Sequence, residues 1–128
     1  MAPKLRKGHF LGYHDNFIIL FGGKDGDNNI LNDLWILNLS DKKWIQIEDK
    51  FVKQVPQKMY YHDGEIIDRH GKIFFFGGKK TSDKTITILN LNVLLDLYES
   101  YSNLKSNDKN ITKLNLWNFV NAPGNLIN

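Results

Sequence analysis

The chain has 128 residues, 41% hydrophobic and 24% charged, which is the size and composition of one folded domain. Because cysteine is absent, a disulfide framework, a thiolate zinc site and a cysteine nucleophile are all excluded. The net charge of +3 is only mildly basic. The apolar runs are too short to cross a membrane, and the basic N-terminus lacks the apolar core of a secretory signal, so we expect a cytoplasmic protein.

Short β-branched and aromatic runs, separated by Asn, Asp and Gly, predict four strands in the first part of the chain. These strands cover residues 9–13, 17–21, 34–39 and 43–47. Turn-forming residues occupy 14–16, 24–32 and 40–42. Four strands joined in sequence predict an antiparallel meander.

The second part of the chain repeats this pattern, with an insertion. Its predicted strands cover residues 65–67, 73–76, 86–91 and 114–120. The inserted segment, 92–112, carries apolar residues at helical spacing after a candidate cap at Asn92. These residues are Val93, Leu94, Leu97, Tyr98 and Tyr101. We expect this stripe to pack on its own sheet; docking of a partner is the alternative.

Three features recur in the same order in both parts. NFIILFGG at 16–23 matches GKIFFFGG at 71–78, and ILNL occurs at both 36–39 and 88–91. A tryptophan follows each time, Trp44 and then Trp117. We interpret this order as a true internal repeat.

The ordered set of Arg6, His9, FIILFGG, NDLWILNLS and KKWIQI resembles a kelch repeat, the blade of kelch-type β-propellers. KIFFFGG, TITILNLN and Trp117 resemble a second repeat, in which Thr87 occupies the position of Trp35. The resemblance implies an all-β fold of two four-stranded antiparallel blades of an incomplete propeller, to which the spacing in the insertion adds a short helix. It divides the chain into repeat one, 1–55, and repeat two, 56–128.

The resemblance also implies structural roles for the repeated residues. The double glycine ends the second strand, an aromatic residue occupies the third, and a tryptophan of the fourth packs between blades. The structural residues are Gly22, Gly23, Trp35, Trp44, Gly77, Gly78 and Trp117. Two blades do not close a propeller, which takes about 4–8. We therefore expect a fragment of a larger propeller, or self-association that completes one.

Several chemical motifs fail on their spacing. Gly22-Gly23-Lys24 lacks the remainder of a phosphate loop. The run Asp25-x-Asp27-x-Asn29 lacks the glycine and the final glutamate of a calcium loop. Lysines 79, 80 and 84 form a basic cluster without aromatic stacking residues, so we expect a solvated loop and no nucleic-acid binding. We therefore expect no enzyme activity, no cofactor and no metal.

Successive connections of a meander alternate between the two ends of its sheet. Loops 24–32 and 79–84 should therefore share one rim with the linker 49–58, and turns 14–16 and 68–71 should share the other with the insertion. Kelch-like propellers commonly bind proteins through the first rim, and loops on a rigid scaffold usually carry recognition. The candidate partner-binding residues are Lys24, Asp25, Asp27, Asn28, Asn29, Lys79, Lys80, Asp83 and Lys84.

The predicted function is a non-enzymatic module that binds a protein or peptide, with no role at a membrane. One alternative is the non-catalytic propeller part of a multidomain enzyme or ubiquitin-ligase adaptor. Another is a propeller that binds a carbohydrate or metabolite through Arg6 and His9 at the channel mouth.

Overall fold

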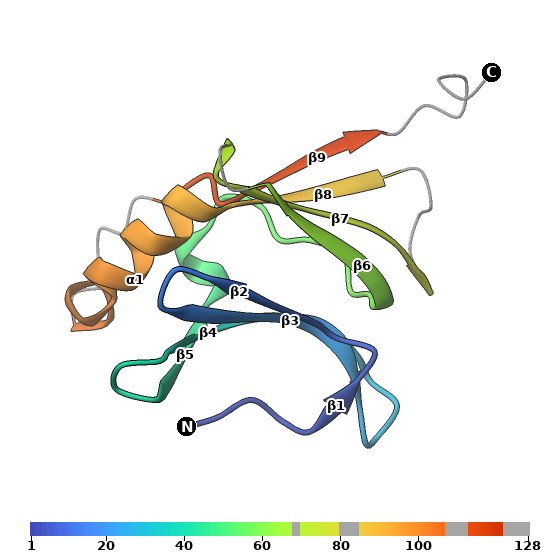
Figure 1. Ribbon diagram of the computed structural model, residues 1–128, viewed down its shortest axis with the longest axis horizontal. Helices are drawn as coiled ribbons and strands as arrows, with labels where there is room; N and C mark the ends of the chain where they lie inside the picture. Colours follow the sequence, from blue (N-terminus) through green and yellow to red (C-terminus); the bar gives the residue numbers. More distant parts are fainter. Residues whose placement is uncertain (68–69, 80–84, 107–112, 122–128) are drawn as a thin grey trace.

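A computed structural model describes residues 1–67, 70–79, 85–106 and 113–121. In this part of the chain, two antiparallel sheets pack face to face, and helix α1 (Leu91–Ser106) lies at one side of the space between them (Figure 1). The predicted fold class, two antiparallel sheets with a helix in the insertion, is confirmed.

Sheet one contains the four strands predicted for the first repeat and one short addition. Its strands are β1 (Arg6–Lys7), β2 (Phe10–His14), β3 (Phe17–Asp25), β4 (Ile30–Asn38) and β5 (Lys43–Ile47). The order is β1-β3-β4-β5, and β2 also pairs with β3. Arg6 lies opposite Asp25 and Phe10 opposite Phe21, so β1 and β2 together fill a single edge position.

Sheet two is a four-stranded meander in chain order. Its strands are β6 (Tyr60–Ile67), β7 (Lys72–Lys79), β8 (Thr85–Asn90) and β9 (Trp117–Asn121). β6 begins five residues before the predicted strand, because its first residues pair with the end of β7, where Tyr60 lies opposite Lys79.

Equivalent positions of the two repeats pair in the same way in the two sheets. Leu37 pairs with Trp44 in sheet one, and Leu89 pairs with Trp117 in sheet two. Likewise Leu20 pairs with Trp35, and Phe75 pairs with Thr87. Residues of the second, third and fourth strands of sheet one therefore have counterparts in sheet two.

The double glycine of repeat one does not end its strand. β3 continues through Gly22 and Gly23 to Asp25, and the register shifts between Phe21 and Gly23. The two glycines have φ angles of +72° and +108°, a conformation that other residues rarely adopt. The expectation of a strand end is wrong because this bulge keeps the strand paired, and the loop shortens from 24–32 to 26–29.

The core lies between the sheets. Phe21 of sheet one packs against Phe75 and Trp117 of sheet two, with ring centroids 5.0 and 4.9 Å apart. Trp117 is therefore a packing residue between the sheets, as predicted. Trp44 is not, because its side of sheet one faces away from sheet two, and it is only half-buried.

Helix α1 is longer than expected and contributes directly to the core. Leu94, Leu97 and Tyr101 are 0–3% exposed and belong to the same cluster as the inter-sheet residues. α1 contacts β5 of sheet one as well as β7 and β8 of sheet two. Leu94, Leu97 and Tyr101 are thus buried inside the molecule and Val93 and Tyr98 pack partly buried against the same core, as expected for a stripe that packs on the protein's own sheets.

Candidate functional site

The loop rim is the end of the molecule formed by β1, the turn 26–29 and the segment 56–60. Backbone hydrogen bonds hold these parts together: Gly23 donates to the Met59 carbonyl at 2.8 Å, and Met59 donates to that of Leu31 at 3.0 Å. The start of the linker lies elsewhere, because Lys53 donates to the Leu114 carbonyl and Phe51 packs on Tyr101 of α1. Only the last residues of segment 49–58 therefore reach the predicted rim.

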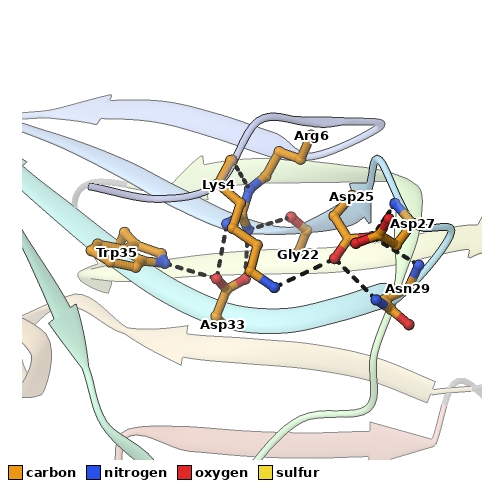
Figure 2. A network of polar contacts seen from close by, with 8 residues as sticks. All are labelled: Lys4, Arg6, Gly22, Asp25, Asp27, Asn29, Asp33 and Trp35. Atoms are coloured by element: carbon orange, nitrogen blue, oxygen red, sulfur yellow. Dashed lines mark hydrogen bonds and ion pairs between the residues drawn. The ribbon is translucent and has the colours of Figure 1, made fainter. Parts of the chain in front are cut away.

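Asp25 shapes the turn from within. Its Oδ1 accepts hydrogen bonds from the backbone N–H groups of Asp27 and Asn29, at 2.9 and 3.0 Å, and its Oδ2 accepts one from the Asn29 side chain (Figure 2). The Asn29 hydrogen bonds, with the Asp27 bond and the nearby Lys4 charge, lower the pKa of Asp25. The side chain is only 5% exposed. Asp25 therefore holds the turn in shape rather than presenting its carboxylate at the surface.

The turn that Asp25 fixes presents its other polar residues to solvent. Asp27, Asn28 and Asn29 are exposed, and Asn28 has a φ of +64°, which makes the tip tight. Lys24 is half-buried, with its Nζ 5.1 Å from the ring centroid of Tyr60 in sheet two. The expected residues of repeat one therefore do gather at one rim, in different roles.

The expected residues of repeat two are located only in part. The backbone of Lys79 pairs with Tyr60, which brings the end of β7 to the same rim as Lys24. Lys80, Asp83 and Lys84 lie outside the described residues.

A partly buried ion pair joins β1 to β4, near the turn. Arg6 donates two hydrogen bonds to the Asp33 carboxylate, at 2.5 and 2.9 Å, and a third to the Gly22 carbonyl (Figure 2). Trp35 Nε1 donates to the same carboxylate at 2.8 Å. Burial alone would raise the pKa of Asp33, but the hydrogen bonds from Arg6 and Trp35 lower it overall. The Arg6 side chain is 3% exposed, so it is committed to Asp33 and does not reach a ligand.

Sequence reasoning missed Asp33. The sequence did indicate that Asp33 and Trp35 are neighbours, because residues two apart on a strand share a face. Its pairing with Arg6 spans 27 positions along the chain and depends on β1 joining the sheet.

Two hollows flank the turn, and Asp25 lines both. One has a volume of about 290 Å³ and includes Lys7 and Lys24; the other, about 420 Å³, includes Lys4 and Lys58. Lys4, Lys7 and Lys58 are exposed, and their positive charges make the rim suited to a polar or acidic segment. Within the described residues there is no group of three or more metal-ligating side chains, and the helix is too short and polar to cross a membrane.

Comparisons with known proteins place a family motif on sheet one. Residues 5–50 match the model of the kelch motif. This match contains β1 to β5 and the whole turn 26–29, and it confirms the resemblance stated from the sequence.

Three relatives extend the similarity beyond that motif. The protein ral2 of Schizosaccharomyces pombe is 30% identical over 99 residues, covering 77% of this chain and 16% of its own length. The tRNA wybutosine-synthesizing protein 2/3/4 of Oryza sativa subsp. japonica is 32% identical over 80 residues, 60% of this chain and 7% of its own length. An F-box/kelch-repeat protein of Arabidopsis thaliana is 33% identical over 85 residues, covering 60% of this chain and 17% of its own length. The chain spans less than a fifth of each of these relatives.

Proposed function

Because residues 5–50 carry a kelch motif, we propose that the chain is a non-enzymatic interaction module that binds a protein or peptide through the loop rim. The observation that supports this most is the turn 26–29, whose exposed tip is fixed from beneath by Asp25. A rigid, solvent-facing tip loses little conformational entropy when a partner binds.

The two hollows favour side chains of a partner over a whole cofactor. Their volumes of about 290 and 420 Å³ lie at the low end of the range of small-molecule sites. Asp27, Asn28 and Asn29 stand between them as hydrogen-bonding groups, and the lysines supply positive charge. The proposed contact set also includes Lys24, Lys79, Lys80, Asp83 and Lys84, with Asp25 acting through the turn.

The test is a selection of displayed random peptides on the immobilised chain, followed by titration calorimetry with the selected sequences. Lys58→Glu reverses an exposed positive charge at the larger hollow, and we expect it to weaken binding at least about 10-fold. Asp96→Lys, a charge reversal on the exposed side of α1, should leave binding unchanged. Equal affinities of wild type and Lys58→Glu for every selected peptide would rule out the rim.

The low coverage of the relatives supports a second candidate. According to this second candidate, the chain is the non-catalytic part of a multidomain enzyme or ubiquitin-ligase adaptor. The rim would then recruit a substrate or partner for the other domains of that protein. Sequencing the transcript through the codon for Asn128 tests this: an open frame that encodes a further domain supports it, and a stop codon there contradicts it.

A further inference from the structure

Tyr61 has a backbone conformation that a residue of its type rarely adopts. Its φ angle is +55°, although it lies inside β6 rather than in a turn. Three other non-glycine residues of the described chain have a positive φ, and all of them lie in turns between strands: Asp15, Asn28 and Lys42. A bulky side chain in this conformation strains the backbone. Tyr61 therefore lowers the stability of the strand in which it lies.

Repeat one has a glycine at the equivalent position. Strand register makes the pairs Gly8-His9 and Tyr61-His62 equivalent, since each lies across from the double glycine of its own sheet. The φ angle of Gly8 is +66°, close to that of Tyr61. Both repeats therefore need a positive φ at this bend, and glycine provides it without strain.

The Tyr61 side chain does not recover this cost by burial, because it is 52% exposed. Its backbone N–H donates to the Gly8 carbonyl at 2.6 Å, a hydrogen bond that any residue at this position could make. Its ring lies against Gly8, where an added Cβ would be 3.0 Å from Cδ1 of the tyrosine. The ring is thus held in place while half of it faces solvent, which leaves it available for contact with a partner.

Tyr61 lies beside lysines of the loop rim. Its ring centroid is 5.2 Å from that of Tyr60, and the Tyr60 centroid is 5.1 Å from Nζ of Lys24. Lys24 pairs with Lys7 across β3 and β1, and both lysines line the smaller hollow. Like charges directly opposite each other on neighbouring strands repel. The site therefore has a second feature that lowers stability, and an acidic group of a ligand would relieve it.

Asp25 also lines this hollow, but its carboxylate is engaged elsewhere. It accepts hydrogen bonds from the backbone of its own turn and lies 3.6 Å from Nζ of Lys4. Within the part of the chain that the structure describes, no ion pair joins Lys7 or Lys24 to a carboxylate. An acidic side chain that enters the hollow would therefore meet two lysines whose charges these residues do not neutralise.

We propose that Tyr61 determines specificity for a partner segment in which an acidic residue adjoins an aromatic or large aliphatic one. The apolar side chain packs on the exposed part of the Tyr61 ring, and the carboxylate lies between Lys7 and Lys24. This inference rests on the proposed binding of a peptide at the loop rim, and it names the kind of sequence that is bound. A rigid aromatic ring supplies a large contact area at little cost in conformational entropy.

The test compares two glycine substitutions that relieve the same kind of strain. Tyr61→Gly also removes the ring, whereas Lys42→Gly relieves a φ of +59° in the exposed turn at the other end of β4. The probes are the peptides selected by display on the wild type, titrated by calorimetry. We expect Tyr61→Gly to bind them at least about 10-fold more weakly. Lys42→Gly should bind like the wild type, and so should Tyr61→Phe, which keeps the ring.

Urea denaturation separates a role in binding from a role in the fold. In Tyr61→Gly the released strain should offset the lost contacts of a half-exposed ring. The midpoint of unfolding should therefore stay at or above that of the wild type. A lower midpoint would show that the tyrosine serves the fold, and would overturn the proposal.

The selected peptides test the chemistry of the partner. We expect them to share an acidic residue beside an aromatic or large aliphatic one, and replacing that acid by its amide should weaken binding about 10-fold. Peptides without this pair, or equal affinities of Tyr61→Gly and Lys42→Gly, would overturn the proposal. If Lys58→Glu weakens binding and Tyr61→Gly does not, the loop rim remains the site without Tyr61. If neither variant changes binding, the proposed function itself fails.

Discussion

Gly22 lies where the backbone of β3 meets the segment that leads into β6. A Cβ on Gly22 would lie 2.7 Å from the Met59 carbonyl oxygen and 2.9 Å from Cε1 of His62. The neighbouring Gly23 N–H donates to that same carbonyl. The glycine pair is therefore needed for inter-sheet contact as well as for its positive φ.

Gly22→Ala should consequently reduce the free energy of unfolding by about 2 kcal/mol or more, since it adds strain at φ +72° to a clash with backbone. Gly26→Ala is the matched control, because no heavy atom lies within 4 Å of its added Cβ. It should change the same quantity by less than about 0.5 kcal/mol. Urea titration measures both, and equal losses would contradict this role of Gly22.

Thr87 departs from the repeat and lowers the stability of the fold. It takes the place of Trp35 and is completely buried, and its hydroxyl has no hydrogen-bond partner. A smaller side chain fits there because Phe75, its neighbour on β7, fills the space between the sheets. A buried hydroxyl of this kind lowers stability rather than adding to it.

At the scale of elements, α1 acts as a brace between the sheets. It begins at the end of β8, where Leu91 N–H donates to the Gly71 carbonyl, and reaches β4 through a hydrogen bond of 2.8 Å from Asn38 to Tyr98. The Tyr101 hydroxyl lies 2.5 Å from the Gln46 carbonyl oxygen and 2.8 Å from Glu48 Oε2. Burial, together with Glu48, raises the pKa of Tyr101, so its hydroxyl remains a proton donor.

Tyr101→Phe removes that donor without removing the ring, and should lower the free energy of unfolding by about 1–2 kcal/mol. Tyr13→Phe is the control, since Tyr13 is 65% exposed, and it should change little. Chemical denaturation gives both values. A loss for Tyr101→Phe no larger than for the control would show that the brace does not depend on this hydroxyl.

At the scale of the whole molecule, the two sheets share one core and should unfold together. Phe21 belongs to sheet one and Phe75 to sheet two, yet they pack on each other and on Trp117. Neither sheet can lose its inner face without exposing that of the other.

Far-UV circular dichroism and tryptophan fluorescence should therefore follow a single unfolding transition at low protein concentration. Phe21→Leu and Phe75→Leu should each move that whole transition, by about 1–2 kcal/mol in unfolding free energy. If one substitution shifted only part of the signal, the sheets would be independent units.

The sequence was sufficient to predict the helix and all the strands except β1 and the first half of β6. Strand segments are short, rich in β-branched and aromatic residues, and bounded by turn residues, all of which are local properties. The helical spacing of Leu94, Leu97 and Tyr101 predicted α1 for the same reason. The rim was also predictable in outline, because connections in a meander alternate between ends.

The tertiary structure decided which faces and side chains are buried, because burial depends on what lies opposite. Trp44 and Trp117 hold the same place in the two repeats, yet among the residues that the structure describes only Trp117 has a sheet across from it. Asp25 and Arg6 likewise carry charges that suggest recognition. In the folded chain, however, the Asp25 carboxylate accepts hydrogen bonds from its own turn, and Arg6 pairs with Asp33. Local pattern fixes the elements of this protein, whereas contacts between residues distant in the chain determine which of them remain available to a partner.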